Sequence, residues 1–223
     1  MWVLVKQTDG LLRAEGLGED RHSAEGIERL LALLCLCGSA YGMVMGCFGG
    51  WSGDRIWQVL YSAAKVPLLL LGTFLICLPS FFILNTVAGV RSDFGRALRA
   101  LLATQAAMTV ILCSFAPFTA LWYLTSANYH SAVLFNGMVF AVSSLAAQVI
   151  LRRLYRHLIQ RSRKHANLLR IWLVSYVFVG IQLGWLLRPF VGQPSSAVEL
   201  FRQNAWGNAY LEILHHLAGV IAR

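Results

Sequence analysis

Five apolar runs, each close to the length that crosses a bilayer, constrain this 223-residue chain more than any other feature. A helix rises about 1.5 Å per residue and needs about 20 apolar residues to cross the hydrocarbon core. Charged residues make up only 13% of the sequence, whereas a soluble domain carries about 25%. The sequence therefore predicts an all-α fold, a polytopic transmembrane helical bundle. Its five spans are expected at about 29–50, 66–90, 100–124, 131–151 and 169–191.

The rest of the chain divides into an arm and a tail around this bundle. Residues 1–28 form a mixed-charge N-terminal arm, residues 29–191 the bundle, and residues 192–223 a C-terminal tail. Apolar residues recur in the tail at roughly helical spacing, which is typical of an amphipathic helix. We expect this helix to lie on the outer membrane surface. Its two adjacent histidines, His215 and His216, point apart on a helix and do not suggest a metal site.

Lys and Arg residues are distributed unevenly among the connecting segments. Of the 19 in the chain, seven lie in residues 152–170, in the connection between the last two predicted spans and at the start of the last span, and the connection at 125–130 has none. Lys and Arg accumulate on the cytoplasmic side of a membrane. With five spans, this pattern predicts an N-terminus inside and a C-terminus outside, with the first span as a signal anchor. We expect the bacterial cytoplasmic (inner) membrane, and a basic helical loop on its cytoplasmic side.

Four glycines follow one another at intervals of four residues in the first predicted span: Gly38, Gly42, Gly46 and Gly50. Glycine destabilises a helix interior by about 0.5–1 kcal/mol relative to alanine. Small residues at this spacing nevertheless let two membrane helices approach closely along one stripe. This glycine zipper predicts a close helix contact. Its partner could be another span of the same chain, another membrane protein or a second copy, and a pore lined by copies is a special case.

The basic loop between the last two spans is a second candidate site. Cationic side chains near a membrane attract anionic lipid headgroups, and an acidic protein partner would be attracted in the same way. Topology alone is the simpler explanation, because positive residues hold a short loop inside. No fold signature of nucleic-acid binding accompanies the charge. The candidate residues are Arg152, Arg153, Arg156, Arg161, Arg163 and Lys164.

Polar side chains within the spans are a third candidate set. Amides in membrane helices usually form hydrogen bonds between helices, and a cavity for a ligand is the alternative. Lys65 and Arg188 flank apolar spans, and we expect both to extend their charges to the headgroups. The amides in this set are Asn85, Gln105, Asn136, Gln148 and Gln182.

Carboxylates are scarce, and this argues against several function classes. None occurs between Asp93 and Glu199. Proton- and cation-coupled transporters usually need such groups inside the membrane, and general acid–base catalysis needs paired ones. No catalytic motif is present, and all five cysteines lie in predicted spans, where they are expected to be packing thiols. We therefore expect no enzymatic activity, no cofactor and no metal.

One stretch resembles a known family. Residues Asn85 to Tyr123 are similar to the middle of bacterial Yip1-like membrane proteins, in which a span ends at a glycine, a short loop contains a phenylalanine, and the next span carries a proline. Gly89, Phe94 and Pro117 are the matching residues here. The resemblance implies five spans, a cytoplasmic N-terminus and a non-enzymatic membrane role. It transfers no functional residue.

Taken together, these patterns favour a non-catalytic integral membrane subunit or scaffold. It would assemble with another membrane protein or with itself through close helix packing, and it would contact membrane lipids. A homo-oligomeric channel or membrane-perturbing effector is one alternative. A small-molecule or lipid carrier, with a cavity lined by the span amides, is another.

Overall fold

The computed structural model describes residues 24–50, 53, 55–126, 128–192 and 198–201. Within these residues the chain is helical and contains no strand, and five helices are long and apolar enough to span a membrane. The predicted all-α bundle is therefore confirmed, as is an integral membrane protein with several spans. Most of the predicted arm, the amphipathic tail helix and the His215–His216 pair lie outside the described residues.

The helices follow the predicted spans but several are longer. They are α2 (Ala24–Gly46), α3 (Arg55–Val87), α4 (Phe94–Thr125), α5 (Tyr129–Arg161) and α6 (Lys164–Leu186), with short 3₁₀ turns at Cys47–Gly49 (η2) and Arg91–Asp93 (η3). The three middle helices have 33, 32 and 33 residues. At about 1.5 Å per residue each is about 50 Å long, which exceeds a hydrocarbon core of about 30 Å.

The start of α3 differs most from the sequence-based expectation. Residues 55–65 were expected to connect two spans, but they form a single helix with the span that follows. The physical reason is that no glycine or proline interrupts the chain before Pro67, so the helical hydrogen bonds continue past the polar residues. Hydropathy locates the apolar part of a helix and not its end.

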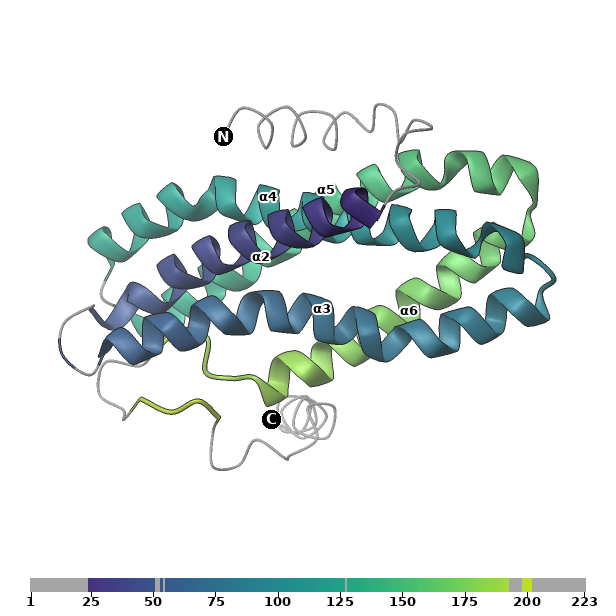
Figure 1. Cartoon of the computed structure of the whole chain (residues 1–223). Helices are drawn as coiled ribbons and strands as arrows, with labels where there is room; N and C mark the ends of the chain where they lie inside the picture. Colours follow the sequence, from purple (N-terminus) through teal and green to yellow (C-terminus); the bar gives the residue numbers. More distant parts are fainter. Residues whose placement is uncertain (1–23, 51–52, 54, 127, 193–197, 202–223) are drawn as a thin grey trace, which may run out of the picture.

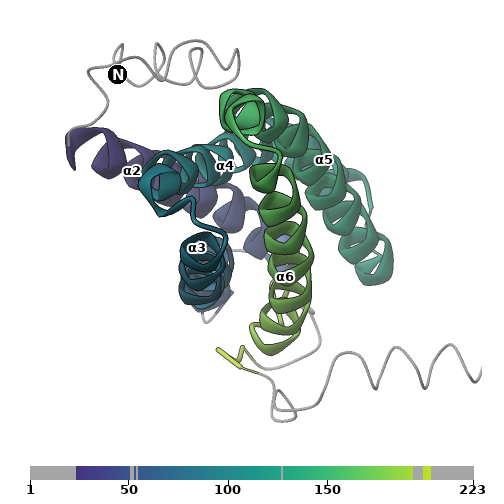
Figure 2. The ribbon, with the colours of Figure 1, turned by 90° about the vertical axis from the view of Figure 1, so that its right-hand side faces the viewer.

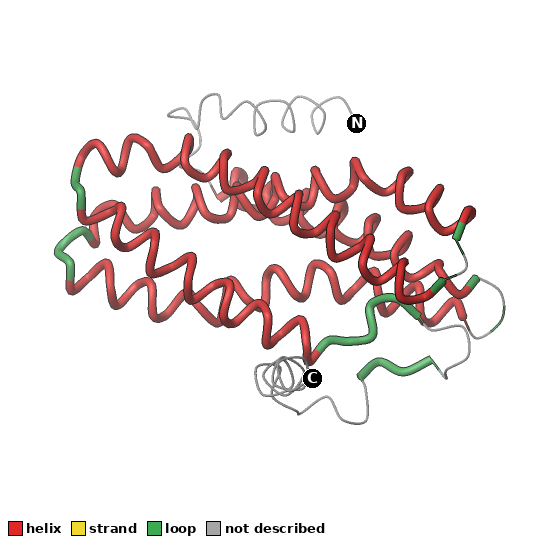
Figure 3. Tube along the Cα trace, turned by 180° about the vertical axis from the view of Figure 1, so that it is seen from behind, coloured by secondary structure: helices red, strands yellow, loops and turns green. Residues whose placement is uncertain are grey.

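The helices pack around α2, which lies between α3 and α4 (Figure 1). α5 packs on α4, and α6 packs on α3. α5 and α6 share a turn and contact each other little, and Figure 2 shows them diverging from that turn. We call the end of the bundle with the α3–α4 and α5–α6 connections the Asp93 end. The opposite end, with the start of α3, the start of α5 and the segment after α6, is the Lys65 end (Figure 3).

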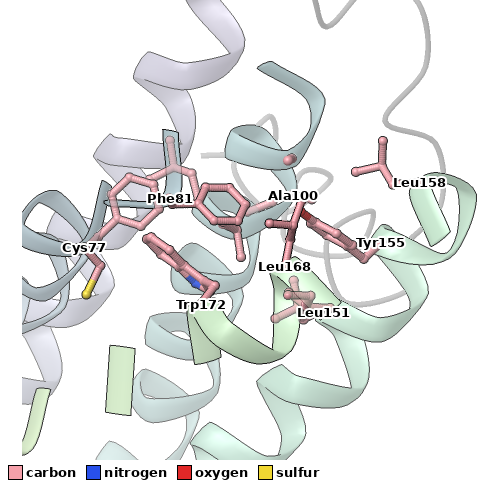
Figure 4. Close-up of a cluster of buried hydrophobic side chains, with 14 of the residues drawn as sticks. Cys77, Phe81, Ala100, Leu151, Tyr155, Leu158, Leu168 and Trp172 are labelled. Atoms are coloured by element: carbon pink, nitrogen blue, oxygen red, sulfur yellow. The ribbon is translucent and has the colours of Figure 1, made fainter. Parts of the chain in front are cut away.

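Small and aromatic residues fill the core near the Asp93 end. Residues 101–109 of α4 are all buried, and many of them are alanines or threonines, which let the neighbouring helices come close. Phe81 of α3 and Trp172 of α6 pack with their ring centroids 4.9 Å apart (Figure 4). Tyr155 and Leu168 extend the same cluster towards α5. This core holds the diverging helices together at one end.

Candidate functional site

The chain turns back into the bundle after α6. Residues 187–192, here called the strap, cross the Lys65 end, and Leu187, Val191 and Gly192 are buried. Backbone carbonyls in such a segment have no helical partner, and a buried carbonyl without a hydrogen bond is costly. The strap therefore needs donors from elsewhere in the bundle.

One face of α3 supplies these donors. Gln58, Ser62 and Lys65 stand at positions i, i+4 and i+7 of the helix, and all three are buried. The Lys65 ammonium donates to the Pro189 carbonyl at 2.7 Å. The Ser62 hydroxyl donates to the Phe190 carbonyl at 2.5 Å, and the Gln58 amide donates to the same oxygen at 3.4 Å.

The position of Lys65 corrects one expectation from the sequence. Its side chain was expected to extend to the headgroups, but the residue is only 2% exposed. Its ammonium instead donates to a strap carbonyl, because the chain after α6 returns to cover this part of α3. Arg188 is half-buried, and its guanidinium carbon lies 3.4 Å from the centroid of the Trp185 ring. The helical spacing of Gln58, Ser62 and Lys65 is the sequence signal that could have revealed this face.

A cavity of about 810 Å³ lies at the same end. Its walls come from the N-terminal parts of α3 and α5, the end of α2, the strap and residues 198–199. One part of the lining is polar or cationic, and another is aromatic or aliphatic. Lining residues include Arg55, Gln58, Asn136, Phe140, Arg188 and Phe190.

The α5 wall of this cavity is partly exposed. Leu134 is 72% exposed and Val133 is 42% exposed, and Gly137 is exposed as well. A Cβ atom placed on Gly137 would meet no atom within 4 Å. The cavity thus adjoins an apolar helix surface on one side and charged groups on the other.

Asn136 connects the cavity wall to the interior. Its side-chain oxygen accepts from the Tyr41 hydroxyl at 2.9 Å, and its side-chain nitrogen donates to the Tyr123 oxygen at 2.6 Å. The Tyr123 hydroxyl donates in turn to the Met45 carbonyl at 3.3 Å. This network joins α2, α4 and α5, and it holds Asn136 in one orientation.

The five predicted amides are not brought together. The Gln105 oxygen accepts from the Tyr176 hydroxyl at 2.9 Å and so links α4 to α6. Asn85 donates to the Phe81 carbonyl of its own helix at 2.8 Å. Gln148 and Gln182 are half-buried. Of the five amides, Asn136 alone lines the cavity, and the rest of its lining comes from other residues of α2, α3 and α5 and from the segment after α6.

The glycine zipper is used within the chain. A Cβ on Gly42 would collide with the Ser62 carbonyl oxygen, and one on Gly46 would lie 2.8 Å from the Val59 Cα. α2 and α3 are thus in backbone contact along this stripe. Gly38 is less tightly packed, and Gly50 lies beyond the helix at a φ of 93°. Of the partners that the sequence left open, Gly42 and Gly46 therefore pack against another span of the same chain, α3.

The basic loop divides into two groups. Arg161 and Lys164 bind other parts of the chain: the Arg161 guanidinium donates to the Asp93 carboxylate at 2.8 Å, and the Lys164 ammonium donates to the Ala88 carbonyl at 2.9 Å. The buried Asp93 also pairs with Arg96 at 3.2 Å. The remaining candidates of the basic loop are exposed: Arg152, Arg153, Arg156 and Arg163.

Asp93 was not identified as a site residue from the sequence. Its carboxylate pairs with Arg96 and Arg161, and it lies 3.4 Å from the side chain of His165. Because Arg161 belongs to α5 and His165 to α6, Asp93 joins the α3–α4 connection to both helices. Its isolation as the last acid before a long basic stretch was the available signal.

We compared the chain with known protein families, curated proteins and solved structures. No family model, curated protein or solved structure matches the chain. The resemblance to Yip1-like proteins stays a prediction.

Proposed function

We propose that this chain is a non-catalytic integral membrane protein that binds an amphiphilic small molecule at its Lys65 end, as a carrier or receptor would. The observation that carries the proposal is the cavity of about 810 Å³ between α3, α5 and the strap. Pockets for small molecules commonly have volumes of about 300–1,000 Å³ and combine apolar walls with a few placed polar groups.

The two sides of the cavity suit the two parts of an amphiphile. Arg55, Gln58 and Arg188 make one side of the lining polar and cationic, which suits a polar headgroup. Val133 and Leu134 offer an exposed aliphatic surface on α5, along which an acyl chain would lie. A molecule with a polar headgroup and an acyl chain would contact both the polar side and the aliphatic side of the cavity.

This proposal replaces assembly through the glycine zipper as the first choice. Gly42 and Gly46 are covered by α3, so they offer no face to a second chain. Assembly through other surfaces stays a prediction, and so does the channel. The carrier alternative gains support because a cavity with placed polar groups accompanies it.

We also propose that the Asp93 end faces the cytoplasm. The exposed Arg152, Arg153, Arg156 and Arg163 extend from α5 and the following turn at that end, where they would contact anionic headgroups of the inner leaflet. In a cysteine-free background, a membrane-impermeant maleimide added to whole cells should label Gly53→Cys and not Arg163→Cys. The reverse pattern would overturn the orientation.

A cavity-filling variant tests the binding proposal. Gly137→Phe places a ring on the cavity wall without displacing a neighbour, because a Cβ there meets nothing within 4 Å. The same is true of Gly95 on α4, at the other end, so Gly95→Phe is the matched control. We expect native mass spectrometry of protein purified in mild detergent to show bound lipid on the wild type and on Gly95→Phe. Gly137→Phe should retain about tenfold less. Equal retention by the two variants would refute the site.

A further inference from the structure

We propose that Cys37 of α2 and Cys113 of α4 are a redox-active pair, which a quinone dissolved in the bilayer oxidises to a disulfide. The disulfide would join α2 to α4 inside the membrane. This inference does not depend on the ligand of the cavity, and it goes beyond the packing role that the sequence predicts for the cysteines.

The two thiols meet where α2 packs on α4. The side chains of Cys37 and Cys113 are hydrogen-bonded to each other, and both residues are half-buried. A disulfide forms without movement of the backbone only between side chains that face each other at short range. Hydrogen-bonded thiols on neighbouring helices face each other in this way.

The register of the two helices supports the contact independently. A Cβ placed on Gly38 would lie 3.5 Å from a side-chain methyl of Thr109, and the Tyr123 hydroxyl donates to the Met45 carbonyl at 3.3 Å. Later residues of α2 thus meet later residues of α4, so the two helices run in parallel. The cysteine pair falls in the same register.

The depth of the pair restricts the oxidant. Cys37 lies near the middle of the membrane-spanning segment Gly26–Gly49, and a charged, water-soluble oxidant such as glutathione disulfide does not enter hydrocarbon. Attack by sulfur needs a thiolate, which hydrocarbon also disfavours, so the oxidant must take up protons as well as electrons. A quinone is apolar, accepts two electrons and has two oxygens that bind protons.

Oxidation of the pair transfers two hydrogen atoms. The two S–H bonds break, one S–S bond forms, and two protons and two electrons pass to the quinone. The thiols become a disulfide, the quinone becomes a hydroquinone, and no charge remains in the membrane. The cross-link would fix α2 one turn before Tyr41, whose hydroxyl binds Asn136 at the cavity wall.

The test uses full-length protein in lipid bilayers and two variants with two cysteines each. The pair variant carries Cys35→Ala, Cys47→Ala and Cys77→Ala, and it retains Cys37 and Cys113. The control carries Cys37→Ala in place of Cys35→Ala. Residues two apart on a helix point to nearly opposite sides, and Cys35 is exposed, so the control has no facing thiol pair.

Free thiols are counted after incubation with a short-chain ubiquinone. The protein is unfolded in sodium dodecyl sulfate and labelled with a maleimide–polyethylene glycol, which shifts the band on a gel for each free thiol. We expect the pair variant to lose both thiols, with one hydroquinone formed per protein, and the control to keep both. Dithiothreitol should restore the lost thiols, which distinguishes a disulfide from a quinone adduct. Aqueous glutathione disulfide should leave both thiols of the pair variant free.

Each other result overturns a distinct statement. Thiols that persist with ubiquinone but disappear with copper phenanthroline would overturn the quinone, as would equally fast oxidation by glutathione disulfide. Thiols that persist with both ubiquinone and copper phenanthroline would overturn the pair itself, and so would equal loss of thiols within monomers of the control. Peptide mapping of the oxidised wild type, in which linked Cys37 and Cys113 peptides are expected, provides the same decision if the substitutions impair folding.

Discussion

Alanine substitutions along the glycine zipper probe the closest contact in the bundle. At Gly42 an added Cβ would meet the Ser62 carbonyl oxygen and would lie 2.9 Å from the Ala63 Cα. At Gly46 it would lie 2.8 Å from the Val59 Cα. Both obstacles are backbone atoms, so α2 and α3 would have to separate. At Gly38 the nearest atom is a side-chain methyl of Thr109 at 3.5 Å, which is ordinary contact.

The expected energies differ in sign along the series. Overpacking of a close contact costs about 1–3 kcal/mol, and alanine in place of glycine returns about 0.5–1 kcal/mol of helix stability. Gly42→Ala and Gly46→Ala should therefore lower the free energy of unfolding by about 1–2 kcal/mol. Gly38→Ala gains helix stability without overpacking a contact, so it should raise the free energy of unfolding by up to about 1 kcal/mol.

Unfolding by sodium dodecyl sulfate in mixed micelles, followed by circular dichroism, measures this free energy. Sedimentation of the same variants reports the oligomeric state. We expect Gly42→Ala to be destabilised with its oligomeric state unchanged, since the contact lies within one chain. A Gly42→Ala variant as stable as the wild type would refute the close α2–α3 contact. A variant that changes only its oligomeric state would show that the stripe binds a second chain.

Three further substitutions test the other contacts by the same unfolding assay or by labelling. Asn136→Leu should lower the free energy of unfolding by about 1–3 kcal/mol, because two tyrosine hydroxyls lose their buried partner. Asp93→Asn should lower it by about 1–2 kcal/mol, a modest effect because its arginine partners are more than half exposed. Lys65→Met should release the strap, so that Val191→Cys, at a site 3% exposed in the wild type, reacts with maleimide in a background without the native cysteines.

Each of these variants has a control of the same chemistry. Gln148→Leu removes a half-buried amide, Glu28→Gln an exposed carboxylate and Arg170→Met an exposed cation. We expect each control to stay within about 0.5 kcal/mol of the wild type and to leave the strap protected. A control that matched its test variant would contradict the assigned contact.

The amides illustrate how far sequence reasoning reaches. A polar side chain within an apolar span must find a hydrogen-bond partner, and Asn136 and Gln105 do find partners on other helices. The identity of those partners could not be predicted, because Tyr41 and Tyr176 are distant in the sequence and are brought close only by packing. The sequence also left open that these amides line one cavity together. In the structure they lie apart from one another.

Lys65 illustrates a failure with a physical cause. A cation near the end of a span usually reaches water, and hydropathy contains no information about a segment that returns 124 residues later to cover it. The buried face of Gln58, Ser62 and Lys65 was visible as a helical spacing, but it had no interpretation without the strap carbonyls. The cavity depends on the same return of the chain.

The sequence by itself determined the number and approximate position of the five spans, because crossing length and apolar composition are local properties of each segment. It also determined that α2 needs a close neighbour along its glycines. Only the tertiary structure decided that this neighbour is α3, that Asp93 joins three helices, and that the strap closes the Lys65 end. These contacts join residues far apart in the chain, so they depend on how the helices are arranged and not on the composition of any one of them.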